Sequence, residues 1–139
     1  MLFLDLSLAQ FAGIAIALVV RIGMAAVAAA WPIAYLAVAV AVALIYRLAE
    51  PFAPGLVLDV LWFTVLYNLL LAAFNLLPIP PLDGYNVALA FVPPRTAFTI
   101  QRYAPYGVLV LLLLVFLPGS PLGAVFGWIG GATRILTGA

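Results

Sequence analysis

The chain has 139 residues, of which 69% are hydrophobic and only 6% are charged. A soluble domain of average composition carries about 25% charged residues, so the composition indicates an integral membrane protein instead. The net charge of +1 supplies no basic surface for nucleic acid, which is excluded as a partner. Cysteine and histidine are both absent, which removes thiolate chemistry, the commonest general base and the commonest metal ligand.

A membrane-spanning helix needs about 20 apolar residues, so a chain of this length has room for about three to four of them. We therefore expect an all-α polytopic membrane protein in which residues 1–139 form a single integral-membrane domain. The expected location is a bacterial-type inner or cytoplasmic membrane, with the lipid bilayer and other membrane-protein subunits as partners.

The first apolar stretch predicts a helix over residues 6–20 and a span over residues 22–48. Arg21 separates them because a guanidinium is costly at the bilayer centre and belongs at a membrane boundary. One long helix, kinked at Pro32, is the alternative. Because small residues let helix backbones approach closely, we expect Gly23 and Pro32 at helix-packing positions.

A second span is predicted over residues 56–77. Asn68 and Asn75 lie seven residues apart in it, hence on one face of the helix. One interpretation is hydrogen bonding to a neighbouring helix, worth about 0.6 to 2 kcal/mol for each amide. The other is a role in shaping the loop that follows, and the sequence leaves both open.

The most informative stretch comes next, where the chain reads Pro78-Ile79-Pro80-Pro81-Leu82-Asp83-Gly84. Three prolines remove backbone donors and prevent the helix from continuing, so we predict a re-entrant-type loop over residues 75–84, with the motif itself at 78–84. An ionisable group at membrane depth usually marks a functional site, which makes Asp83 the candidate residue. Gly84 permits a tight exit into the next helix.

Residues 85–103 carry Arg95 and Arg102 beside aromatic residues, a pattern typical of short interfacial helices. Residues 106–136 contain two apolar segments too short to span comfortably, and a C-terminal hairpin is expected there. If the spans alternate, Arg95, Arg102 and Arg134 share the side of the motif loop. The positive-inside rule then favours the cytoplasmic side for that loop.

The motif follows the pattern Asn-x-x-Pro-x-Pro-x-Leu-Asp-Gly, and its matching residues are Asn75, Pro78, Pro80, Leu82, Asp83 and Gly84. This pattern, with Asn68 seven residues upstream, resembles the second signature of the site-2 protease family of intramembrane zinc metalloproteases. The stretch from Arg21 to Pro32 is similar to a helix of that family that carries Ala-Gly-Pro. The resemblance implies that Asp83 corresponds to the third zinc ligand, and that Asn75, Pro78 and Pro80 shape the site and the substrate path.

In that family a His-Glu-x-x-His helix supplies the other two zinc ligands and the general base, and this chain has no histidine. Trp31 and Tyr35 also stand where the family usually has Gly and Asn. A hydrolytic zinc needs about three protein ligands, so Asp83 alone is half of a site. We therefore predict no catalytic residue, no metal and no cofactor in this chain alone, and a structural role for Asp83. Its carboxylate would be satisfied by backbone N–H groups, an Arg or water, or would take up a proton.

These observations favour a catalytically inactive, site-2-protease-like membrane protein that acts as a structural or accessory subunit of a larger membrane complex, an energy-transducing complex being one candidate host. The alternative is half of a split or truncated zinc protease, whose His-Glu-x-x-His helix comes from elsewhere and whose cofactor is zinc. A transporter or channel subunit is the third hypothesis, because a helix broken near the midplane is typical of transporters.

Overall fold

The computed structural model describes residues 2–139, with side chains from residue 8 onward. Its elements are α1 (Leu2–Ala49), α2 (Gly55–Asn75), α3 (Asp83–Phe91), α4 (Pro94–Arg102), the 3-10 helix η1 (Ala104–Tyr106), α5 (Gly107–Phe116) and α6 (Pro121–Thr137). No strand occurs within this described range, which confirms the all-α prediction. Two helices, α1 and α2, are long and apolar enough to cross a membrane, and α4 with the segment of η1 and α5 would add a third span, bent by 48°.

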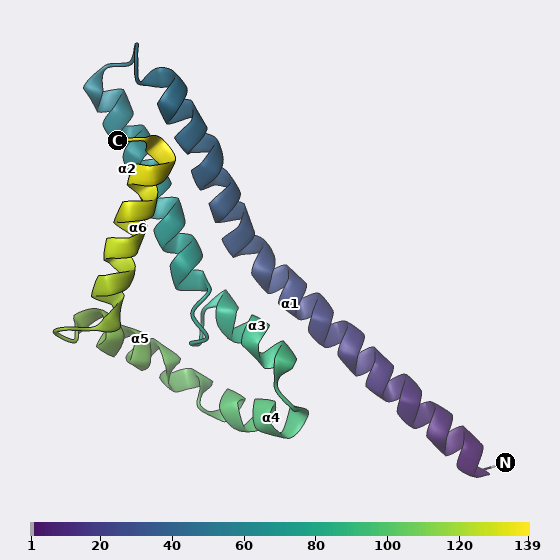
Figure 1. Cartoon of the computed structure of the whole chain (residues 1–139). Coiled ribbons are helices and arrows are strands. Elements are labelled where there is room, and N and C mark those ends of the chain that lie inside the picture. The colour runs from purple at the N-terminus through teal and green to yellow at the C-terminus, as the bar shows by residue number, and fades with distance from the viewer. Residues whose placement is uncertain (1) are drawn as a thin grey trace.

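Helix α1 runs without interruption from Leu2 to Ala49, past Arg21 and through Pro32 (Figure 1). This is the single long helix of the alternative interpretation, rather than separate helices over residues 6–20 and 22–48. At 1.5 Å per residue the helix is roughly 70 Å long, more than twice the hydrocarbon thickness of about 30 Å. Every side chain from residue 8 to residue 20 is exposed. This N-terminal part of α1 therefore presents bare apolar surface.

Helix α2 returns along the C-terminal half of α1 after a turn at residues 50–54 (Figure 1). Ala39 and Ala43 of α1 and Val65 of α2 are almost completely buried between the two helices. Lipid supplies no hydrophobic drive between helices, so small residues that allow close backbone contact stabilise such a pair. Leu136 of α6 packs against the same cluster.

This tight contact predicts that Ala39→Leu will destabilise the helix pair. Ala39 has no exposed surface, so three additional carbon atoms must push α1 and α2 apart, at an expected cost of about 1 to 3 kcal/mol. Ala41→Leu is the matched control, because Ala41 is exposed on the same helix. Unfolding titrations in mixed micelles should show the loss for Ala39→Leu alone, and equal effects of the two changes would contradict this packing.

The segment after α2 differs in detail from the expected loop at 78–84. The chain leaves α2 at Asn75 and re-enters a helix already at Asp83, so Asp83 and Gly84 belong to α3. Helix α3 then packs against α1, alongside the part of α1 that α2 does not reach (Figure 1). The short interfacial helices expected over residues 85–103 correspond to α3 and α4.

The C-terminal segment also differs from the hairpin expected over residues 106–136. Helix α5 leads away from the motif loop, and α6 turns back to pack mainly against α2 and α1 (Figure 1). The inner face of α6 carries the buried Ile129, Thr133 and Thr137, and each Thr hydroxyl donates to a carbonyl within the helix. The C-terminus of α6 therefore lies beside the turn between α1 and α2. Arg134 is in the last turn of α6, next to the Ile135 carbonyl that Arg47 binds, and so does not lie on the side of the motif loop as the sequence suggested.

Candidate site around Asp83

Asp83 is the first residue of α3, directly after the extended Leu82. Its position follows from the three prolines, which end α2 and prevent a new helix from starting earlier. A carboxylate in the first turn of a helix interacts favourably with the positive end of the helix dipole. Gly84 and Tyr85, the next two residues, are buried. The start of α3 is therefore anchored while the Asp83 side chain itself is half-buried.

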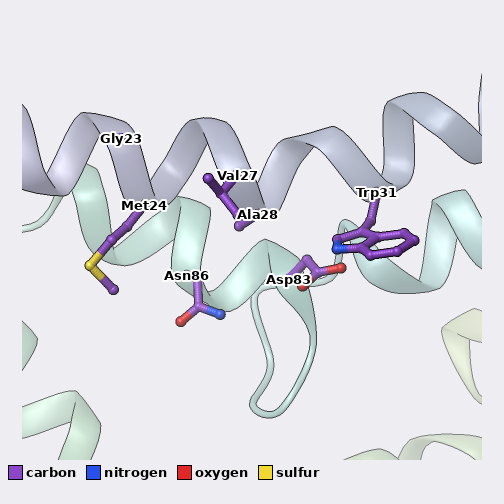
Figure 2. A pocket seen from close by; sticks show the side chains of 7 residues that line it. All are labelled: Gly23, Met24, Val27, Ala28, Trp31, Asp83 and Asn86. Carbon is purple, nitrogen blue, oxygen red and sulfur yellow. The ribbon is translucent and has the colours of Figure 1, made fainter.

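Asp83 faces a pocket of about 420 Å³ between α3 and α1 (Figure 2). The pocket is lined by Asp83 and Asn86 of α3 and by Gly23, Met24, Val27, Ala28 and Trp31 of α1. In Figure 2 the Asp83 carboxylate points toward the indole ring of Trp31. That ring also pairs with Tyr35, at 6.5 Å between ring centroids. The two residues that depart from the family pattern therefore form one aromatic cluster beside Asp83.

The donor groups of this pocket do not fit a hydrolytic zinc ion. Zinc in such sites takes about three protein ligands from His, Cys, Asp or Glu and leaves one position open for water. Asp83 is the only residue of those four types in the lining. The polar atoms of the α1 wall are the indole N–H of Trp31, which donates hydrogen bonds and cannot bind a cation, and the weak thioether acceptor of Met24. Across residues 8–139, no group of three such side chains is positioned to hold a metal ion.

The opposite end of α3 is held by Arg21 of α1. One guanidinium nitrogen, Nη2, donates to the carbonyl oxygen of Leu89 at 2.5 Å and to that of Val92. Both carbonyls belong to the C-terminal end of α3, where the helix leaves acceptors without an internal partner. Asp83 thus lies at the N-terminus of α3, where the helix dipole favours a negative charge. Arg21 binds the C-terminus of α3, where the dipole favours a positive charge.

Arg47 makes the same kind of contact at the other end of α1. Its Nε donates to the carbonyl of Leu136 and its Nη2 to that of Ile135, both at 2.6 Å, at the C-terminal end of α6. Each arginine of α1 therefore joins the free end of a different helix to α1. Sequence reasoning placed Arg21 at a membrane boundary but missed these partners, which lie 68 to 89 residues away along the chain.

The two asparagines of α2 bond within their own helix. Asn68 Nδ2 donates to the Thr64 carbonyl at 2.8 Å, and Asn75 Nδ2 donates to the Leu71 carbonyl at 2.9 Å. Within residues 8–139, neither amide nitrogen donates a hydrogen bond to another helix or to the motif loop.

The two prolines that match the motif lie away from the Asp83 pocket. Pro78 and Pro80 line a separate pocket of about 430 Å³, together with Tyr85, Tyr103 and Tyr106. Gly23 lines the Asp83 pocket with free space above its backbone, whereas Pro32 is fully buried.

The sequence of the chain is similar to those of two proteins that are named as zinc metalloproteases. Over 61 residues the chain is 43% identical to "Putative zinc metalloprotease YwhC" of Bacillus subtilis, covering 44% of this chain and 26% of that protein. Over 99 residues it is 34% identical to "Putative zinc metalloprotease Rip3" of Mycobacterium tuberculosis, covering 62% of this chain and 25% of that protein. No family model and no solved structure matches.

The chain thus spans about a quarter of the length of the curated relatives it matches. These similarities confirm the resemblance that the motif predicted. Together with the long apolar helices α1 and α2, they indicate an integral membrane protein that is similar over part of its length to site-2-protease-like zinc metalloproteases.

Proposed function

We propose that this chain is a catalytically inactive, site-2-protease-like membrane protein that acts as a structural or accessory subunit of a larger membrane complex. The observation that supports this proposal is the α1 surface opposite Asp83. It presents Gly23, Val27, Ala28 and the Trp31 indole, none of which can bind zinc or activate water. The carboxylate therefore faces a wall without the metal ligands and the general base that hydrolysis requires.

A structural role for Asp83 is supported by its place in α3. The carboxylate lies in the first turn and Arg21 binds the last carbonyls, so the two charges act on the dipole of the same short helix. Nine residues make a marginal helix by themselves. Both charges therefore help to keep α3 folded against α1.

A role as a subunit is supported by the length of α1. This helix is more than twice as long as the hydrocarbon core is thick, so its apolar surface cannot all lie in lipid while the helix stands upright. Apolar surface outside the bilayer is normally covered by protein. The exposed stretch over residues 8–20 offers partner helices such a surface.

We propose the cytoplasmic side for the motif loop. Arg21 binds the end of α3, and Arg95 and Arg102 lie in α4, which shares a pocket with the motif loop. Arg47 binds the C-terminal end of α6, and Arg134 lies in the last turn of that helix, at the opposite end of the fold. The excess is one arginine, and the positive-inside rule assigns the richer end to the cytoplasm.

A second candidate function is a zinc protease site completed by residues from outside these 139. One observation favours this candidate. The Asp83 carboxylate faces an open pocket and forms no ion pair with any described side chain. A metal shared with another polypeptide segment would provide the missing partner for this charge.

Asp83→Asn, with Asp59→Asn as control, distinguishes the two candidates. Asn keeps the size of the side chain but removes its charge, and Asp59 is an exposed carboxylate of α2. We expect no stoichiometric zinc in the purified wild-type protein, unchanged assembly of the Asp83 variant, and a loss of at most about 1 kcal/mol from the helix dipole. Zinc binding together with peptide cleavage, both lost in Asp83→Asn and kept in Asp59→Asn, would establish the shared protease site instead.

A further inference from the structure

We propose that α4 and the pocket behind it bind one anionic phospholipid of the bilayer, with the phosphate on Arg95 and Arg102 and an acyl chain in the pocket. The site lies apart from Asp83, and the inference does not depend on the proposed function. It rests on the two faces of α4, on the charge that surrounds them, and on the aromatic residues that follow the helix.

The first face of α4 closes a pocket of about 360 Å³ against α1 and α3. Four residues form this face at the spacing i, i+3, i+4 and i+7, namely Pro94, Ala97, Phe98 and Gln101. The opposite walls carry the apolar residues Ala17, Met24, Leu89 and Ala90 and the polar residues Arg21 and Asn86. A pocket whose walls are mainly apolar with a few polar groups is suited to one hydrocarbon chain whose head group stays outside.

The second face of α4 is basic. Arg95, Thr99 and Arg102 follow one another at i, i+4 and i+7, directly beside the pocket-lining face. Both arginines are exposed. The sequence has no Asp or Glu after Asp83, so neither α4 nor any later segment supplies an acidic partner. Two exposed guanidinium groups without a local counter-charge are complementary to a phosphate, which arginine binds with directed hydrogen bonds.

The aromatic residues in and after α4 favour a position at the membrane interface, which supports the same ligand. Phe98, Tyr103 and Tyr106 are 67%, 67% and 62% exposed. Exposed aromatic rings beside basic residues are typical of the membrane interface, where phospholipid phosphates lie. The 48° bend between α4 and the segment of η1 and α5 lets α4 follow the surface while α5 enters the apolar layer. A lipid bound there would place its phosphate at the interface, beside the basic face of α4, and its acyl chain in the apolar layer, beside the pocket-lining face.

Native mass spectrometry of the full chain in detergent, titrated with phosphatidylglycerol or phosphatidylcholine, tests the head-group contact. An arginine near an anionic membrane surface contributes about fivefold in affinity, so Arg95→Gln with Arg102→Gln should weaken phosphatidylglycerol binding about 30-fold. The corresponding double lysine variant should keep most of the binding, because it keeps the charge. Arg102→Gln alone is compared with Arg134→Gln, an exposed arginine of α6 whose loss should leave binding unchanged.

The acyl-chain contact has its own matched pair. Ala97→Phe fills the pocket and should weaken phosphatidylglycerol binding severalfold, whereas Thr96→Phe adds the same ring outside the pocket lining and should not. Equal binding of the two lipids, or equal losses for Arg102→Gln and Arg134→Gln, would overturn the proposal in favour of unspecific lipid contact. Equal effects of the two phenylalanine variants would remove the pocket from the site.

Discussion

Gly84→Ala is expected to lower the free energy of unfolding by about 3 kcal/mol, the upper end of the cost of overpacking. A Cβ at Gly84 would collide with the carbonyl carbon and oxygen of Leu76 and would lie 2.6 Å from the carbonyl oxygen of Leu77. These are backbone atoms at the end of α2, which cannot rotate away as a flexible side chain could. The methyl group must therefore push α3 off the end of α2.

The control for Gly84→Ala is Gly127→Ala in α6, where a Cβ meets nothing within 4 Å. Alanine is the better helix former by about 1 kcal/mol, so this change should be neutral or slightly stabilising. Thermal unfolding of the purified chain, followed by circular dichroism, should show a melting temperature for Gly84→Ala lower by about 6 to 12 °C. A melting temperature within a degree or so of that of Gly127→Ala would mean that α3 does not approach α2 this closely.

Arg21→Gln is expected to have the second-largest effect, a loss of about 2 to 3 kcal/mol in the docking of α3 on α1. Arg21 is half-buried, and its guanidinium satisfies the carbonyls of both Leu89 and Val92. Hydrogen bonds from a charged donor are worth about 1.5 to 3 kcal/mol. Removing the donor takes the guanidinium from the Val92 carbonyl and leaves the Leu89 carbonyl with the long 3.4 Å bond from the Val92 N–H. The shorter, neutral Gln cannot replace both bonds.

Arg47→Gln is the natural comparison, since Arg47 binds two carbonyls of α6 with similar geometry but is itself exposed. Water can replace those bonds, so the expected loss is about 1 kcal/mol or less. Amide hydrogen exchange should show faster exchange in α3 for Arg21→Gln, with α6 unaffected. Unchanged protection of α3 would show that Arg21 does not hold its C-terminal end.

The sequence predicted those features that depend on neighbouring residues. The second span and its abrupt end follow from an apolar run that meets three prolines, and the structure ends α2 at Asn75. The sequence also has Asp83 directly after the three prolines, and the structure begins α3 at Asp83. The pocket beside Asp83, with the Trp31 indole in its lining, exists only because α3 packs on α1. No local sequence pattern encodes that packing.

Long-range partners account for what the sequence could not predict. Arg21 suggested a boundary between two helices because an unpaired guanidinium is costly in the membrane. In the structure the Arg21 guanidinium donates to two carbonyls at the end of α3, and α1 continues unbroken past Arg21. The return of α6 to α2, and with it the position of Arg134, likewise depends on contacts between segments far apart in the chain. Hydrophobic segments of 10 and 17 residues do not reveal which helix they pack against.

We propose that Asp83 holds no metal and that the chain serves as a subunit. The most direct test is gentle isolation of the chain from its native membrane, with mass spectrometry of the proteins present in stoichiometric amount and measurement of zinc per chain. We expect a larger assembly of membrane subunits without stoichiometric zinc and without a protein that carries a His-Glu-x-x-His motif. One partner with that motif, together with one zinc ion that is lost in Asp83→Asn, would instead make the chain part of a shared protease site.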